Sequence, residues 1–455
     1  MNSNSYILLG CFCALILSPY LLRRFARQST DVYGAFAVGA RNFGWFRITA
    51  GLSATFVGGS AVINVAGLGY TYGWAGLTDA VAISSALLLA ALVVAPRVYH
   101  QHNISLGGSL RVSGRLVNAA TGLLSTVVYT LITAAQIVAL IKVAQPYFPM
   151  PPALLALIAT VGIAAYVIYG GYNSVTVTDV IQFVVVGSCY FALVAVVLWA
   201  GGSASPAAVG AAVPAQPMPL DMQLLLLVPF LFVPVSQDLH IRINAARSQR
   251  DAQLGTCLAG LVYLVFGVIS VCVGRALAEA GVPLSTPDDA VPTFLAREFG
   301  ALAIIPTFAV LCVVVSSLDS VLFASASSLS YDFWDGLTGR TTPREKDSAH
   351  PRIATAVVLG AALLIALQAP QVLDLILSAV VIYISVLLPM LVGRMLGREP
   401  RAIGILGFVA LAAVIVLEVA EHELPFRVFI YTGTHLLAVF CLRKNTPYET
   451  TSRLQ

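Results

Sequence analysis

The feature that most restricts this sequence is a succession of long apolar stretches, each about as long as a helix that crosses a lipid bilayer. A bilayer core about 30 Å thick is crossed by about 20 apolar residues in a helix. Lipid offers the backbone no hydrogen-bond partner, so membrane-spanning chains form helices or closed barrels. Because the stretches are continuous and lack the ten-residue alternation of barrel strands, we expect an all-α membrane protein.

The composition agrees with this expectation. Of the 455 residues, 58% are hydrophobic and only 10% are charged, against roughly 25% charged residues in a soluble domain. We predict about thirteen transmembrane helices, at residues 5–22, 46–70, 76–96, 117–143, 152–170, 176–200, 222–241, 254–276, 300–331, 353–368, 372–392, 402–420 and 426–442.

The distribution of Lys and Arg predicts the orientation of these helices, because cytoplasmic loops of membrane proteins are enriched in both residues. With thirteen spans and the N-terminus outside, 21 of the 25 Lys and Arg residues fall on the cytoplasmic face. We therefore expect a multi-pass protein of the plasma (inner) membrane, with Met1 outside and Gln455 in the cytoplasm. The net charge of +4 then reflects topology, and no nucleic-acid partner is implied.

The sequence lacks the motifs that are typical of several classes of protein. A GxxxxGK[ST] phosphate-binding loop is absent, so no nucleotide is expected as a partner. Neither an HExxH zinc motif nor a nucleophile elbow is present, so an enzyme is not expected. The first apolar stretch is followed, and not preceded, by positive charge at Arg23 and Arg24, which favours a retained helix over a cleaved signal peptide.

Two of the predicted helices contain residues that interrupt a helix. The second holds Gly58 and Gly59 near its middle, and adjacent glycines weaken a helix. The seventh holds Pro229 and Pro234, each of which removes a backbone hydrogen bond. A packing pair of glycines and an ordinary proline kink would explain each alone. If the first span is set aside, however, these are helices 1 and 6 of a five-plus-five inverted repeat, where discontinuous helices surround the ion and solute sites.

The ninth predicted helix carries a polar run. Ser316, Asp319 and Ser320 share one helix face, and Ser317 lies beside Ser316. A carboxylate at membrane depth is costly and is functional by default. Sodium is a hard cation that takes oxygen ligands, and two hydroxyls with the free carbonyls of an unwound helix would supply them. Asp179 begins another helix, where it is either a second functional carboxylate or a residue that favours the helix dipole.

Five motifs in order along the chain resemble the sodium:solute symporter family, which includes sodium-coupled carriers of sugars, proline, sialic acid and choline. They lie at residues 36–45, 53–60, 172–182, 237–242 and 316–320. The resemblance implies an inverted-repeat transporter core with one leading and two trailing helices. It divides the chain into a leading helix with its loop at 1–45, core helices 1–5 at 46–200, core helices 6–10 at 201–392, and two trailing helices with a cytoplasmic tail at 393–455.

The same resemblance implies the ligands of an ion and a solute. The sodium site shared by the family maps to the carbonyls of Ala54, Val57 and Val313 and the hydroxyls of Ser316 and Ser317. A second sodium or proton site, found in some members, maps to Asp179, Asp319 and Ser320, with Ser316. Residues expected to line the solute site are Phe56, Ser60, Asp79, Gln136, Ser236, Gln237 and Tyr383.

Residues 55–60 are most similar to the choline-carrier branch of the family. That branch has tryptophans at the positions of Phe56 and Ser236, where their faces help to cage a quaternary ammonium. Phe is a poorer face and Ser is none, so the two residues argue against choline as the solute.

The sequence therefore predicts a sodium-coupled symporter that imports a small organic solute by alternating access, with Na+ as its coupling ion and the lipid bilayer as its surroundings. Two alternatives stay open. A carrier of the same fold could use a proton, with Asp319 or Asp179 as the group that binds it. A transport-like receptor could bind the solute without net flux.

Overall fold

The structure is a computed structural model, and it describes residues 3–22, 37–57, 59–101, 103–110, 114–200, 211–299, 304–338, 349–368, 373–420 and 424–442. Within these residues the secondary structure is helical, apart from an isolated parallel bridge between Phe43 and Ala246. The predicted all-α fold class is confirmed.

Helices occupy each of the predicted apolar stretches. Their bounds are α1 Ser3–Leu22, α3 Trp45–Phe56, α4 Gly59–Tyr72, α5 Leu77–Leu89, α6 Ala95–Tyr99, α8 Arg115–Ala144, α9 Pro152–Ala200, α10 Leu220–Phe232, α11 Gln237–Ala245, α12 Gln249–Glu279, α14 Ile304–Ser327, α16 Ala349–Gln368, α17 Leu373–Met395, α18 Pro400–Ala420 and α19 Leu424–Cys441. In the described part of the chain, seven helical stretches are long and apolar enough to cross a membrane, and four shorter apolar helices accompany them. The count of thirteen spans stays a prediction.

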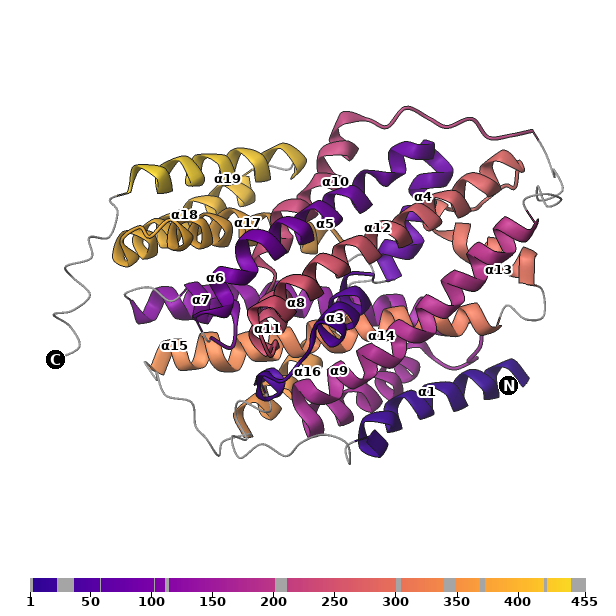
Figure 1. Ribbon diagram of the computed structural model, residues 1–455, viewed down its shortest axis with the longest axis horizontal. Helices are drawn as coiled ribbons and strands as arrows, with labels where there is room; N and C mark the ends of the chain where they lie inside the picture. The colour runs from indigo at the N-terminus through magenta and orange to yellow at the C-terminus, as the bar shows by residue number, and fades with distance from the viewer. Residues whose placement is uncertain are drawn as a thin grey trace.

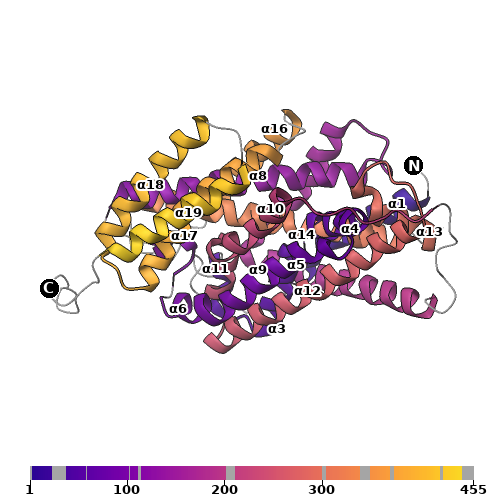
Figure 2. The same ribbon diagram turned by 90° about the horizontal axis from the view of Figure 1, so that it is seen from above.

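The long helices run roughly along the longest axis of the molecule (Figure 1). The last three, α17, α18 and α19, pack on one another at one flank, while α1 packs against α9 at the opposite flank (Figure 2). The beginning of α1 and the end of α19 lie at opposite ends of the bundle (Figure 1). Between the flanks lie the elements that the sequence predicts to hold the ion and the solute.

Both predicted helix breaks are present. The first broken helix consists of α3 and α4. Helix α3 ends at Phe56, Val57 leaves helical geometry with ψ of 49°, and α4 begins at Gly59. The second passes from α10 through a 3-10 turn at Val233–Val235 to Ser236, which is extended with ψ of 129°, before α11 begins. Each break leaves backbone groups that no helical ladder pairs.

A third break separates two predicted spans that are otherwise continuous in α9. Gly171 has φ of 58° and ψ of −150°, outside the helical region. A residue with a side chain rarely adopts this φ, so glycine is the residue that permits the turn. The boundary predicted between 152–170 and 176–200 falls at this position.

Backbone contacts join the start of the first broken helix to the end of the second. The Phe43 N–H donates to Ala245 O at 3.1 Å, and the Arg247 N–H donates to Phe43 O at 2.9 Å. At the beginning of α3, the Trp45 N–H donates to Asp251 Oδ1 at 3.0 Å. These bonds satisfy groups that a helix start otherwise leaves open, and they place α3 beside α11.

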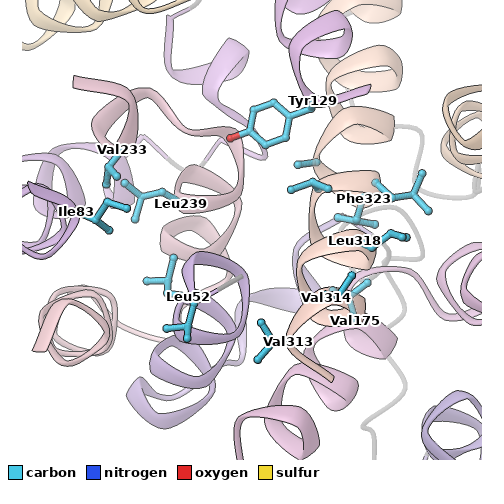
Figure 3. Packing of buried hydrophobic residues seen from close by; sticks show 14 of the residues in the cluster. Leu52, Ile83, Tyr129, Val175, Val233, Leu239, Val313, Val314, Leu318 and Phe323 are labelled. Atoms are coloured by element: carbon cyan, nitrogen blue, oxygen red, sulfur yellow. The ribbon is translucent and has the colours of Figure 1, made fainter. Parts of the chain in front are cut away.

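Helix α14 runs through the interior, in contact with α3, α8, α9 and α16. Figure 3 shows the apolar packing around it, with Leu52 from α3, Val175 from α9, Leu239 from α11 and Leu318 from α14 itself. All four side chains are fully buried. The polar run of α14 is therefore buried in the interior, where an unpaired polar group is costly.

Candidate ion and solute site

The hydroxyls of α14 meet the carbonyls at the end of α3. Ser316 Oγ donates to Ala54 O at 2.8 Å and to Val313 O at 2.9 Å. Ser317 Oγ donates to Thr55 O at 3.1 Å and to Val313 O at 3.2 Å. The structure thus brings together Ala54, Val313, Ser316 and Ser317, four of the residues that the resemblance assigns to an ion, and adds the Thr55 carbonyl, which the sequence did not single out.

A small cavity adjoins this cluster, and the fifth predicted ligand lines it. The cavity is lined by Ser53, Ala54, Val57, Gln182, Val313 and Ser316. The remaining lining is apolar, from Phe183, Val186, Val262 and Phe266. The cavity therefore borders four of the five predicted sodium ligands, and most of its exposed lining is apolar.

A buried arginine, Arg242 of α11, occupies the acidic cluster near this site. Arg242 Nη2 donates to Asp179 Oδ2 at 3.0 Å, to Ser320 Oγ at 2.9 Å and to Thr55 Oγ1 at 2.6 Å. Its side chain is 2% exposed, and that of Asp179 is 0% exposed. The guanidinium also lies 4.0 Å from Asp238 Oδ2. Asp179 and Ser320, two residues predicted to hold a second ion, thus both bind the positively charged side chain of Arg242.

The backbone of α3 leaves room for this arginine only because residue 51 is glycine. A Cβ atom at Gly51 would lie 2.8 Å from Arg242 Nε and 3.2 Å from Asp179 Oδ2. The sequence reasoning missed Arg242 because it counted this residue among the cytoplasmic loop charges. The available signal was its position in the motif at 237–242, four residues after Asp238 on the same helix face.

Asp319 lies near Asp179 and Arg242 but has hydrogen-bond partners of its own. Its Oδ2 atom accepts hydrogen bonds from the Tyr166 hydroxyl and from Thr178 Oγ1, the latter at 3.0 Å. Its Oδ1 atom has no partner, although the residue is fully buried. The three residues predicted for a second site are therefore adjacent on α9 and α14, but Asp319 is held by a different set of donors.

Three predicted solute residues gather at the break between α10 and α11. Tyr383 Oη donates to Val235 O at 2.7 Å, and Ser236 Oγ donates to Val233 O at 2.7 Å. Gln237 Oε1 accepts from the Leu106 N–H at 2.8 Å, while Gln237 Nε2 donates to Asp332 Oδ2 at 3.4 Å. The side chains of these three residues thus form hydrogen bonds with other groups of the protein.

Tyr129 of α8 completes this group and was not predicted. Its hydroxyl accepts from the Gln237 N–H at 2.8 Å and donates to Asp238 Oδ1 at 2.6 Å. Figure 3 shows the ring reaching from α8 with its oxygen at the start of α11. The rings of Tyr129, Phe232 and Tyr383 pack with centroids 5.5–6.3 Å apart. An aromatic surface therefore lies beside the second helix break.

The other predicted solute residues lie elsewhere or are not joined to this group by a described contact. Asp79 is buried on α5, where its Oδ2 atom accepts from the Tyr263 hydroxyl at 3.1 Å. Gln136 Oε1 is buried without a partner on α8, and Phe56 is half-buried at the end of α3. The side chain of Ser60 falls outside the described residues.

Comparisons with known proteins agree on the class of protein. The model of the sodium:solute symporter family matches residues 36–238, which confirms the predicted resemblance. A structure titled as the substrate-bound outward-open state of a Na+-coupled sialic acid symporter has a TM-score of 0.80 at 13% identity, covering 98% of this chain and 99% of that one. None of the curated protein sequences matches this chain.

Two further solved structures share the architecture less closely. Mhp1, a nucleobase-cation-symport-1 family transporter in a closed conformation with bromovinylhydantoin bound, has a TM-score of 0.57 at 16% identity, covering 91% of this chain and 95% of its own. A mutant manganese transporter of Eremococcus coleocola has a TM-score of 0.53 at 13% identity, covering 87% and 92%. At these identities the likeness shows the fold, which is that of inverted-repeat membrane transporters. The expectation of a transporter, and not an enzyme, is confirmed.

The buried pair of Asp179 and Arg242 yields a prediction for stability. Replacing Arg242 by Gln leaves Asp179 as an uncompensated buried charge, and breaking such a pair costs about 3–5 kcal/mol. We expect Arg242→Gln to lower the unfolding temperature in detergent strongly, and the double variant Asp179→Asn/Arg242→Gln to recover part of the loss. As a control, Glu279→Gln removes the Arg275–Glu279 pair at its exposed end, where the Glu279 side chain is 64% exposed, and leaves Arg275 in place over the Trp74 ring, so it should change little. Strictly additive losses in the double variant would contradict this account of the pair.

Proposed function

Proceeding from the match of residues 36–238 to the sodium:solute symporter family, we propose that this protein imports a small organic solute together with sodium. The observation that carries the proposal is the meeting of two α14 hydroxyls, Ser316 and Ser317, with the carbonyls that end α3. A helix break frees carbonyl oxygens, and a helix crossing it supplies hydroxyls. Together they form the kind of oxygen cluster that a small hard cation takes.

The chemistry of this cluster favours a monovalent cation. Its proposed ligands are the Ala54, Val57 and Val313 carbonyls and the Ser316 and Ser317 hydroxyls, all of them neutral. Divalent hard cations in proteins usually take carboxylates, and the described residues contain no group of three or more His, Cys, Asp or Glu that could hold a metal ion. In the described contacts each hydroxyl donates its hydrogen to a carbonyl. Rotation of these hydrogens would turn the oxygen lone pairs towards an ion.

The position of the cluster suggests how an ion would act on a solute. A sodium ion there would pull α14 and the break after α3 together. Helix α11, which follows the second break, is tied to α3 by the Thr55–Arg242 contact at 2.6 Å. Binding energy gained at the ion site would therefore favour one arrangement of both breaks. A ligand shifts a conformational equilibrium only by its difference in affinity for the two states, and this contact provides a route for such a difference.

We propose that one sodium ion suffices, because Arg242 already serves as the cation beside Asp179 and Ser320. A second sodium at Asp179, Asp319 and Ser320 would require the guanidinium to leave. Proton coupling is the second candidate, and the observation that favours it is the unpartnered Oδ1 atom of buried Asp319. Removing sodium while the pH gradient is held constant separates the two, because only a proton-coupled carrier keeps its activity.

The solute region of the proposal is the second helix break, where Ser236, Gln237 and Tyr383 meet the rings of Tyr129 and Phe232. Aromatic faces beside polar backbone groups suit a small organic molecule with an apolar part and a hydrogen-bonding part. Screening solutes for thermal stabilisation with and without sodium would identify it, because a ligand stabilises the state that binds it. Counterflow of that solute in liposomes then distinguishes a carrier from a receptor, which gives none.

The first prediction from this proposal concerns the ion. Ser317→Ala removes one proposed ligand with almost no change in volume. Losing one bond of about 1–3 kcal/mol at a buried polar site should raise the NaCl concentration for half-maximal thermal stabilisation roughly 5- to 150-fold, with KCl as the reference salt. Ser325→Ala is the matched control. Ser325 lies on α14, as Ser317 does, but away from the cluster, and its Oγ atom donates to Thr126 O at 2.9 Å. If Ser316→Ala/Ser317→Ala responds to NaCl as the unchanged protein does, the ion lies elsewhere.

The second prediction concerns orientation in the plasma (inner) membrane. We propose Met1 outside and Gln455 in the cytoplasm, with the chain divided at 1–45, 46–200, 201–392 and 393–455 as the resemblance implies. Burial of Arg242 removes one residue from the cytoplasmic excess of Lys and Arg, but leaves the excess large. A reporter active only in the cytoplasm should give signal from a C-terminal fusion alone. Signal from the N-terminal fusion would rule out this orientation.

A further inference from the structure

Gln182 on α9 is a fully buried amide without a hydrogen-bond partner. Its side chain is 0% exposed, and neither Oε1 nor Nε2 has a partner. Burying a primary amide with all its donors and acceptors open is unfavourable, and native structures nearly always avoid it. A buried amide in this condition indicates that something absent from the polypeptide completes it, such as an ion or an ordered water molecule.

The amide lies at the cavity that borders the proposed sodium ligands. Gln182 lines this cavity together with Ala54, Val57, Val313 and Ser316. Ser53 lines it as well, and its hydroxyl is likewise buried without a partner. Two unpartnered polar side chains from two helices, α3 and α9, thus border one small space beside the carbonyls at the helix break.

We propose that Gln182 is a further ligand of the coupling ion, with its Oε1 atom facing the sodium and its Nε2 group donating to Ser53 Oγ. This inference rests on the proposed function, because it requires a cation at the break after α3. The amide oxygen is a neutral ligand of the same kind as the backbone carbonyls. It raises the proposed oxygen ligands from five to six without adding a charge, and the arrangement satisfies both buried side chains at once.

The proposed ligand gives α9 a place in ion binding. The carbonyl and hydroxyl ligands come from the end of α3, the break after it and α14, whereas Gln182 comes from α9. It lies one helical turn after Asp179, on the same face. An ion bound by Gln182 would therefore hold three elements together, and its occupancy would be sensed on the helix that carries Asp179, the partner of Arg242.

The test replaces the amide and measures binding of sodium itself. Gln182→Met keeps a side chain of similar length without the amide. We expect the NaCl concentration for half-maximal thermal stabilisation of the purified protein, against KCl, to rise at least about tenfold. Gln145→Met is the matched control, because Gln145 Oε1 is also a buried unpartnered amide oxygen but lies at the end of α8, outside the cavity. This control should respond to NaCl as the unchanged protein does.

The outcomes separate this inference from the function on which it rests. If NaCl stabilises the unchanged protein, Ser317→Ala weakens the response and Gln182→Met does not, the inference is overturned and the sodium site stands. If NaCl does not stabilise the unchanged protein beyond KCl, the proposed function fails and Gln182 with it. Should Gln182→Met fail to fold, Gln182→Asn takes its place, since it withdraws the amide by one methylene. The same loss of response is expected, and an unchanged response overturns the inference.

Discussion

The contact between the α14 hydroxyls and the carbonyls at the end of α3 is the interaction on which the rest of the site depends. Ser316 and Ser317 are separated from Ala54 and Thr55 by about 260 residues along the chain, yet they bond at 2.8 and 3.1 Å. Both hydroxyls are buried, so the carbonyls that they meet have little water to turn to. A cation bound here would give the carbonyls a full positive charge in place of the hydroxyl donors that they now have. It would also join α3 and α14, one from each repeat, at one point.

A second constraint comes from the charges enclosed with this site. Asp179, Asp238 and Asp319 are all buried, and Arg242 is the guanidinium that meets two of them. Such a charge is tolerated within a membrane protein where partners face it in the interior. The arginine, in the last turn of the helix that follows the second break, reaches Thr55 of α3, the helix that precedes the first break. The residue that balances the carboxylates therefore also connects the two broken helices, in addition to the backbone bonds of Phe43.

Much of this fold was predictable because its signals are local. Gly58-Gly59 and Pro229 with Pro234 mark breaks by backbone chemistry alone, and apolar length marks the helices. Ser316 and Ser317 could be singled out because hydroxyls next to an intramembrane carboxylate are uncommon.

Arg242 could not be placed, because its partners lie 63 and 187 residues away and depend on the register of packed helices. The π-helical segments at Ala90–Val94 and Ser328–Trp334 leave no comparable sequence signal. Gln182 lay within a recognised motif, but its open amide is visible only once the cavity is formed.

The most direct measurement is equilibrium binding of radioactive sodium to the purified protein, compared with the Ser316→Ala/Ser317→Ala variant. The account predicts saturable binding of about one ion per chain, displaced by unlabelled sodium but not by potassium. The double variant, which loses two neutral oxygen ligands at the helix break, should bind far more weakly. Sodium binding that is undiminished in the double variant, or that never saturates in the unchanged protein, would contradict the claim that this break is where the coupling ion is held.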